Sequence, residues 1–239
     1  MKSNAAKILV VVAVVLLGVG IYLEKTPSIT QIQSVQISSS EVSLNVPAVD
    51  NDGKGVVTTL KVDAKPGNGK VLVDVNQLLF WTDTQYSIQT AKNVAHQITG
   101  VDLSKVDLTY SIETTAPVIE GPSAGAALTI ATIAALENKP LNKSVMITGT
   151  INADGTIGDV GAVSAKANAA KDAGAMIFLV PKGQGAETNY VPENKCEFAA
   201  SYTVCTTVYK PVTSRVGEGG GIEVVEVSNV HDALKYFGL

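Results

Sequence analysis

Positions 8–23 of the chain are a continuous run of uncharged, mostly apolar residues. Lys2 and Lys7 precede the run, and Glu24 follows it. As a helix the run would be roughly 24 Å long, somewhat less than a hydrocarbon core of ~30 Å, and snorkelling by Lys7 can cover the difference. A helix that is apolar all round must be enclosed on every side, and nothing near the N-terminus is suited to wrap it. We therefore expect residues 1–25 to be a signal anchor with one transmembrane helix.

The charges around this run predict which side of the membrane the rest of the chain occupies. Because the lysines lie before the run, the positive-inside tendency places everything after it outside the cytoplasm. The alternative is secretion after signal cleavage, although residues 18–20 (Gly-Val-Gly) only loosely imitate a cleavage site. In an oxidising compartment Cys196 and Cys205 could form a disulfide, and two buried thiols are the alternative. We expect a single-pass, membrane-anchored protein with an extracytoplasmic domain.

The composition favours a globular domain without a nucleic-acid, cofactor or metal site. The chain has 239 residues, 46% hydrophobic and 17% charged, with a formal net charge of −4. That length holds a targeting segment and one sizeable domain. No Lys/Arg run forms the basic stripe that nucleic-acid binding requires. The sequence has no G-x-x-x-x-G-K-[ST] or H-E-x-x-H motif, and it offers a metal only two His and two Cys.

Hydrophobic periodicity predicts both strands and helices along the rest of the chain. Strands are expected at residues 42–46, 56–62, 70–75, 106–112, 144–149, 176–180 and 222–227. Helices are expected at residues 84–98, 124–138, 163–173 and 230–237. Pro66-Gly67-Asn68-Gly69 predicts a hairpin that joins the second and third strands. Residues 183–221, which hold both cysteines, are predicted to be rich in loops.

Ser123 is the first candidate for chemistry, because it lies among small residues at the start of a predicted helix. Gly121 and Pro122 precede it, and Ala124 and Gly125 follow it, so a substrate backbone can approach closely. A helix that begins just after the serine directs free N–H groups at a developing oxyanion, which suits acyl transfer. A closely packed helix N-terminus without catalytic function has the same pattern. This segment alone therefore leaves both interpretations open.

Lys166 is the second candidate, because its neighbours on a predicted helix are small or apolar: Val163, Ala165 and Ala167. Most lysines point to solvent, but burial lowers the pKa of a lysine and favours the neutral amine. A neutral amine could accept the proton of the Ser123 hydroxyl without any His or Asp. The two residues together predict a Ser–Lys dyad.

Several segments in one order resemble the proteolytic domain of Lon proteases. Residues 120–125 (Glu-Gly-Pro-Ser-Ala-Gly) resemble the nucleophile motif of that family, and residues 155–162 (Gly-Thr-Ile-Gly-Asp-Val-Gly-Ala) resemble its conserved turn. Lys166 stands 43 residues after Ser123, which is the spacing of the family's Ser–Lys dyad. The similarity is specific over about residues 106–182.

The resemblance implies the Lon proteolytic-domain fold. This is an α+β fold of mixed sheets and packed helices, like ribosomal protein S5 domain 2, preceded here by one N-terminal hydrophobic helix. We expect a linker and first strand at residues 26–41 and the peptidase domain at residues 42–239. Residues 184–221 look like a cysteine-containing insertion into that domain. Lon domains often assemble into six-membered rings, which implies a homo-oligomer.

The same resemblance implies roles for individual residues. Ser123 would be the nucleophile and Lys166 the general base, with the Thr148 hydroxyl orienting the lysine amine. Backbone N–H groups around Ser123 would form the oxyanion hole. Three supporting residues lie directly before the nucleophile: Glu120, Gly121 and Pro122. Glu120 stands where the family commonly has an acidic residue. The implied function is a serine endopeptidase that cleaves polypeptide substrates through an acyl-enzyme.

Two departures from the family narrow this expectation. Many members carry a His-x-His-x-Pro-Glu stretch before the nucleophile, and here residues 109–113 (Thr-Tyr-Ser-Ile-Glu) take its place. The AAA ATPase that unfolds substrates for the family has no counterpart in this sequence. We therefore expect ATP-independent cleavage of unfolded or loosely folded polypeptides.

Two other functions remain open. Residues 121–125 also satisfy the G-x-S-x-G elbow of α/β-hydrolases, and an esterase of that kind would need His231 with Asp159 or Asp172 as its acid. The other alternative is a catalytically inactive Lon-like domain used for assembly or binding. Cleavage that depends on Ser123 and Lys166 but not on His231 would separate the dyad from both.

Overall fold

The computed structural model describes four stretches of the chain: residues 38–74, 82–114, 121–199 and 202–239. The hydrophobic run at residues 8–23 and the predicted site residue Glu120 lie outside these stretches. Within them, no helix combines the length and the apolar character needed to span a membrane.

Four strands form the first sheet, in the order β1-β2-β4-β3. Their bounds are Ser40–Val49 for β1, Gly55–Pro66 for β2, Val71–Val73 for β3 and Val106–Glu113 for β4. β1 and β2 are antiparallel, and in the turn between them the Asp50 carboxylate accepts hydrogen bonds from the N–H groups of Asp52 and Lys54. Alternate residues such as Leu60 and Val62 are buried, so one face of the sheet packs on the core.

The predicted hairpin between residues 56–62 and 70–75 is wrong. β3 pairs in parallel with β4, and β4 lies between β3 and β2. At the start of β4 the Asp107 carboxylate accepts hydrogen bonds from the backbone N–H groups of Asn68 and Lys70, at 2.8 and 2.9 Å. These bonds hold the turn that follows β2 against the first residues of β4. The chain therefore crosses β4 before it forms β3, and β3 does not pair with β2.

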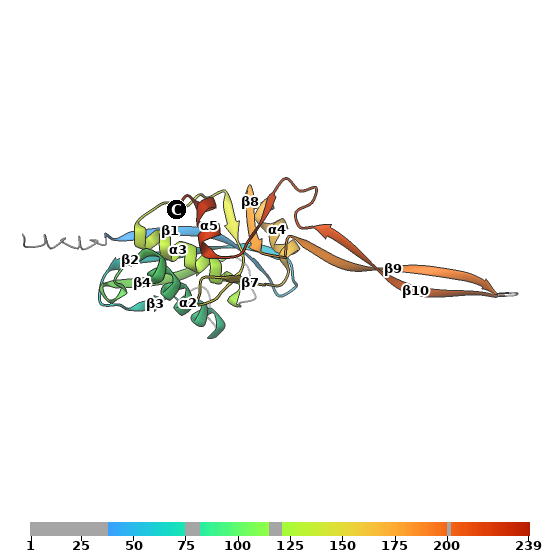
Figure 1. Ribbon diagram of the computed structural model, residues 1–239, viewed down its shortest axis with the longest axis horizontal. Coiled ribbons are helices and arrows are strands. Elements are labelled where there is room, and N and C mark those ends of the chain that lie inside the picture. The colour runs from blue at the N-terminus through green and yellow to red at the C-terminus, as the bar shows by residue number, and fades with distance from the viewer. Residues whose placement is uncertain (1–37, 75–81, 115–120, 200–201) are drawn as a thin grey trace, which may run out of the picture. The chain divides into compact units, whose positions relative to one another are not determined.

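The helix α3 (Gly125–Glu137) lies at the centre of the main core. All of its residues from Gly125 to Leu136 are buried, because a helix that is apolar on every side must be enclosed. It contacts β1 and β2 and the helices α2 (Thr82–Thr99) and α5 (Val230–Phe237), as Figure 1 shows. The helix ends at Asn138, whose left-handed backbone (φ 51°) forms the C-cap.

A second sheet has three parallel strands in the order β11-β8-β5. The bounds are Val145–Ile147 for β5, Ile177–Pro181 for β8 and Glu223–Val227 for β11. The helix α4 (Val163–Asp172) contacts β8 and also β1 and β2, and it closes a second apolar cluster that includes Met146 and Phe178.

The described part of the domain also has four smaller elements: the 3₁₀ helices η1 (Leu103–Lys105) and η2 (Pro122–Ala124) and the antiparallel pair β6 (Thr150–Ile151) and β7 (Ile157–Gly158). The prediction of an α+β fold is confirmed for the described residues.

Residues 183–221, predicted to be rich in loops, instead contain a long antiparallel hairpin. Its strands are β9 (Ala186–Ala199) and β10 (Tyr202–Arg215), and it projects away from the other elements (Figure 1). Residues 188–198 and 202–215 are all exposed. Because neither face of the hairpin packs on the core, its sequence lacks the alternation of apolar and polar residues by which buried strands are recognised. Cys196 lies opposite Cys205, and the two sulfur atoms are 2.06 Å apart.

Gly55, at the start of β2, lets α4 approach the first sheet closely. A Cβ on Gly55 would lie 2.0 Å from the carbonyl oxygen of Ala165, the residue before Lys166. We therefore expect Gly55→Ala to displace α4 and to lower the free energy of unfolding by about 1–3 kcal/mol. Urea denaturation measures this loss. Gly161→Ala is the matched control, because a Cβ at Gly161 has no neighbour within 4 Å, and equal unfolding midpoints for the two variants would contradict the packing role of Gly55.

Candidate active site

Ser123 lies in η2, immediately before the N-terminus of α3, and is half-buried. Its carbonyl oxygen accepts a hydrogen bond from the N–H of Gly149 at 2.9 Å, and the Gly149 carbonyl accepts one from the N–H of Ala126 at 3.0 Å. Gly125 permits this arrangement, because a Cβ there would lie 2.7 Å from the Cγ2 of Ile151 in β6. The residues after β5 therefore fix the backbone on both sides of the Ser123 side chain.

Lys166 projects from α4 into the interior and is only 3% exposed. Burial lowers the pKa of Lys166 from its ordinary value of 10.5 to about 8, because removing water penalises the charged ammonium. Its Nζ donates a hydrogen bond to the Oγ1 of Thr148 at 3.4 Å. Thr148 is fully buried, and its hydroxyl in turn donates to the carbonyl oxygen of Ser123 at 3.4 Å. Thr148 thus links the helix that carries Lys166 to the backbone of Ser123.

Ser123 and Lys166 line one cleft of about 320 Å³. The cleft lies between the end of β1, the η2 turn and the segment before α4, and its lining residues are Ala48, Val49, Gly121, Pro122, Ser123, Thr150, Asp159, Val160, Gly161, Ala162 and Lys166. Among the hydrogen bonds of the described side chains, none joins the Ser123 hydroxyl directly to the Lys166 amine. Bonds of this kind often tighten only when substrate binds. The structure therefore brings the two predicted residues into one cleft.

The base of the hairpin holds the N-terminal end of α4, a contact that the sequence did not predict. The Glu187 carboxylate accepts hydrogen bonds from the backbone N–H and the hydroxyl of Ser164, at 3.1 and 2.7 Å. The side chain of Gln184 bonds to both the N–H and the carbonyl of Val160, at 3.0 and 2.8 Å. Carboxylates are favourable at helix N-termini, and here the donor and acceptor are 23 residues apart in sequence. No local pattern could have identified this contact.

Other residues that the sequence singled out lie elsewhere. His231 is exposed on α5 and does not line the Ser123 cleft, and Asp172 is exposed at the end of α4. Asp159 does line the cleft, at its exposed side. The Nδ1–H of His96 on α2 donates a hydrogen bond to the Val101 carbonyl oxygen at 2.8 Å. The described residues thus bring no histidine to the Ser123 cleft.

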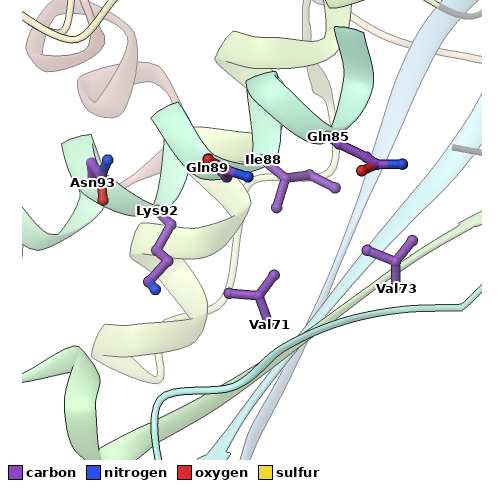
Figure 2. A pocket seen from close by; sticks show the side chains of 7 residues that line it. All are labelled: Val71, Val73, Gln85, Ile88, Gln89, Lys92 and Asn93. Carbon is purple, nitrogen blue, oxygen red and sulfur yellow. The ribbon is translucent and has the colours of Figure 1, made fainter. Parts of the chain in front are cut away.

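A larger cleft, of about 560 Å³, lies between β3 and α2. Figure 2 shows the side chains that line it, from Val71 and Val73 on the strand and Gln85, Ile88, Gln89, Lys92 and Asn93 on the helix. Among the described residues that line it there is no serine, cysteine, histidine or carboxylate, so these residues offer no nucleophile paired with a base. The smaller Ser123 cleft is therefore the candidate active site.

Comparison with known proteins identifies the family. Residues 55–209 match the Lon protease (S16) C-terminal proteolytic domain, so the chain belongs to that family, as the resemblance predicted. An archaeal Lon protease of Thermoplasma volcanium is 38% identical over 89 residues, which cover 37% of this chain and 14% of the relative. An archaeal Lon protease of Thermococcus kodakarensis is 26% identical over 179 residues, which cover 73% of this chain and 28% of the relative. A Lon protease of Vibrio parahaemolyticus is 30% identical over 151 residues, which cover 59% of this chain and 18% of the relative. The chain thus matches only the smaller part of each of these relatives' length.

The burial of Lys166 predicts a pH-dependent cost in stability. Its pKa is about 8 in the folded chain, against about 10.4 for an unfolded lysine. The folded chain therefore binds fewer protons between these values, and its stability rises as the pH increases through that interval. We expect Lys166→Met to raise the free energy of unfolding by about 1–3 kcal/mol at pH 7 and by less above about pH 10. Chemical denaturation of both proteins at the two pH values measures the difference, and an equal effect at both would contradict a buried lysine with a lowered pKa.

Proposed function

We propose that this chain is a serine endopeptidase that uses Ser123 as nucleophile and Lys166 as general base. The observation that carries the proposal is a buried lysine of lowered pKa in the same cleft as a serine at a helix N-terminus. A lysine with a pKa of about 8 keeps a useful fraction of neutral amine near neutral pH, and its conjugate acid can return a proton. Membership of the Lon proteolytic family supports this reaction class.

The reaction would proceed in two halves. The neutral Nζ of Lys166 accepts the hydroxyl proton of Ser123 as the serine oxygen attacks the peptide carbonyl. Backbone N–H groups of Ser123 and its neighbours would stabilise the resulting oxyanion. The Lys166 ammonium then donates its proton to the departing amine, which leaves an acyl-enzyme on Ser123. In the second half, Lys166 activates a water that hydrolyses the ester, and Thr148 keeps the amine oriented throughout.

The rest of the sequence supports proposals for the kind of substrate and for the location of the protein. The chain has no Walker-type motif, so we propose ATP-independent cleavage of unfolded or loosely folded polypeptides. Residues 1–25 would anchor the chain in a membrane, residues 26–41 would link the anchor to the domain, and residues 42–239 would form an extracytoplasmic peptidase domain with the S5 domain 2-like architecture. Residues 184–221 would be an insertion into that domain. By family resemblance the domains would form a six-membered ring.

The second candidate function is an inactive Lon-like domain used for assembly or binding. Among the described side chains no hydrogen bond joins the Ser123 hydroxyl to the Lys166 amine, an arrangement that an inactive domain shares with a dyad that assembles only when substrate binds. Both residues of the dyad are nevertheless present in one cleft. A cleavage assay decides between the two candidates.

The dyad predicts which substitutions abolish cleavage. Incubated with fluorescently labelled casein and no ATP, the full chain in mild detergent should release peptides. Ser123→Ala and Lys166→Ala should each lower the rate at least ~100-fold, because each removes one half of the proton-transfer pair. Lys166→Arg should be equally inactive, since guanidinium stays protonated. His231→Ala is the control and should keep the full rate. Cleavage that persists in Lys166→Ala would contradict the role of Lys166 as general base. Cleavage lost in His231→Ala would favour the esterase-type triad.

The lowered pKa of Lys166 also predicts a pH profile. The base must be neutral to act, so kcat/KM should rise as the pH passes through about 8 and level off above it. Initial rates with one fluorogenic peptide whose own ionisation lies outside this range measure the profile. A rate that stays constant from mildly acidic to alkaline pH would contradict a lysine base.

A further inference from the structure

The two faces of the β9–β10 hairpin differ completely in charge. Residues that lie opposite each other in the register share a face, and successive pairs alternate between faces. The face that holds the Cys196–Cys205 pair consists of the pairs 188–213, 190–211, 192–209, 194–207, 196–205 and 198–203. We call it the uncharged face, because none of these residues carries a charge at neutral pH and the two cysteines are joined in a disulfide. All charged residues between positions 188 and 213 lie on the opposite face: Glu193, Lys195, Glu197 and Lys210.

Two pairs of polar side chains on the uncharged face are already bonded to each other. The hydroxyls of Thr188 and Thr213 share a hydrogen bond of 2.8 Å, and the Thr207 hydroxyl donates to the Asn194 side-chain oxygen at 2.9 Å. Burying a polar group is costly mainly when it loses its hydrogen-bond partner. These side chains would keep their partners under a covering molecule, so the face is suited to burial.

Three aromatic side chains give the uncharged face its binding potential. Phe198 is 90% exposed, Tyr190 68% and Tyr209 66%. An aromatic side chain buries roughly 150–250 Å² in an interface. Scaled by these exposed fractions, three of them on each of two copies would bury roughly 700–1,100 Å² in total, which at its upper end reaches the ~1,000 Å² that specific interfaces need. A two-stranded sheet with both faces in water is also only marginally stable, so a covering partner would stabilise the hairpin.

The arrangement of tyrosine and proline on this face fits a second copy of the same face. Tyr190 lies opposite Pro211, and on the next pair of that face Pro192 lies opposite Tyr209. Tyrosine is therefore on β9 in one pair and on β10 in the next, and proline is on the other strand each time. This alternation gives the face an approximate twofold symmetry. A symmetric dimer interface requires such self-complementarity, because the same patch serves both copies.

Sheet edges are less suited to this contact than the face. Proline has no N–H for a further strand and lysine at an edge discourages added strands. Each strand of the hairpin carries one proline and at least one lysine: Pro192 and Lys195 on β9, Pro211 and Lys210 on β10. Growth of the two-stranded sheet by an extra strand is therefore disfavoured.

From these observations we propose that the uncharged face of the β9–β10 hairpin is a self-association surface, which packs face to face on the same hairpin of a second copy of this chain. This contact is separate from the Ser123 cleft and does not depend on the peptidase proposal.

Molar mass in solution tests the proposal on the full chain. Light scattering coupled to size exclusion, corrected for bound detergent, gives the protein mass relative to the 24.8 kDa chain. The wild type should be a dimer or a higher multiple at micromolar concentration. Tyr190→Ser combined with Tyr209→Ser should lower the mass at least twofold. Val191→Ser combined with Val208→Ser is the matched control, because those residues lie on the charged face, and it should keep the wild-type mass.

Each alternative outcome would overturn the proposal. A monomeric wild type, or a tyrosine double variant of wild-type mass, would exclude self-association through this face. Loss of mass in both double variants would show a nonspecific effect of weakening the hairpin. Circular dichroism and an intact Cys196–Cys205 bond, read by mass spectrometry, establish that each variant is folded. If the monomeric wild type instead binds casein or lipid vesicles and the tyrosine variant does not, the occupant is a polypeptide or a membrane and not a second copy.

Discussion

Enclosure of the apolar helix α3 determines how the other described elements pack. This helix is apolar on all sides, so strands β1 and β2 and helices α2 and α5 must surround it. Enclosure fixes the N-terminus of α3, and with it Ser123, against the residues that follow β5. Gly125 and Gly149 allow this, because side chains at either position would meet Ile151 or Ile157. The position of the candidate nucleophile is therefore a consequence of core packing.

Lys166 depends on the same packing from the other side. α4 can lie close to the first sheet because Gly55 has no side chain, and the second apolar cluster closes beneath it. A buried lysine costs stability in its charged form, and that cost is what lowers its pKa toward the range in which it can act as a base. Glu187 and Gln184 hold the N-terminal end of α4 and the segment before it. The chain thus fixes a destabilising group in place with contacts from a hairpin that is remote in sequence.

Local patterns sufficed to predict much of the fold and to select the candidate site residues. The periodicity of α2, α3, α4 and α5 and of most core strands is visible in the sequence, and so is the cap by which Asn229 accepts a hydrogen bond from the N–H of Asp232. The small residues around Ser123 and Lys166 made both of them candidates, and the spacing shared with the Lon family paired them. The features that were missed depend on distant partners. β3 pairs with β4 because Asp107 holds the preceding turn, and β9 and β10 face water on both sides, so neither gives a buried periodicity. Glu187 is separated by 23 residues from Ser164.

Whether Lys166 activates Ser123 can be measured most directly by the pH dependence of covalent labelling at Ser123. A fluorophosphonate forms a stable adduct with an activated serine hydroxyl, and peptide mass spectrometry identifies the labelled residue. We predict one adduct, on Ser123, at a rate that rises with a midpoint near pH 8, following the lowered pKa of Lys166 of about 8. The rate should fall at least ~100-fold in Lys166→Met. Labelling of Ser123 at the wild-type rate in that variant, or an adduct only on a different serine, would contradict the dyad.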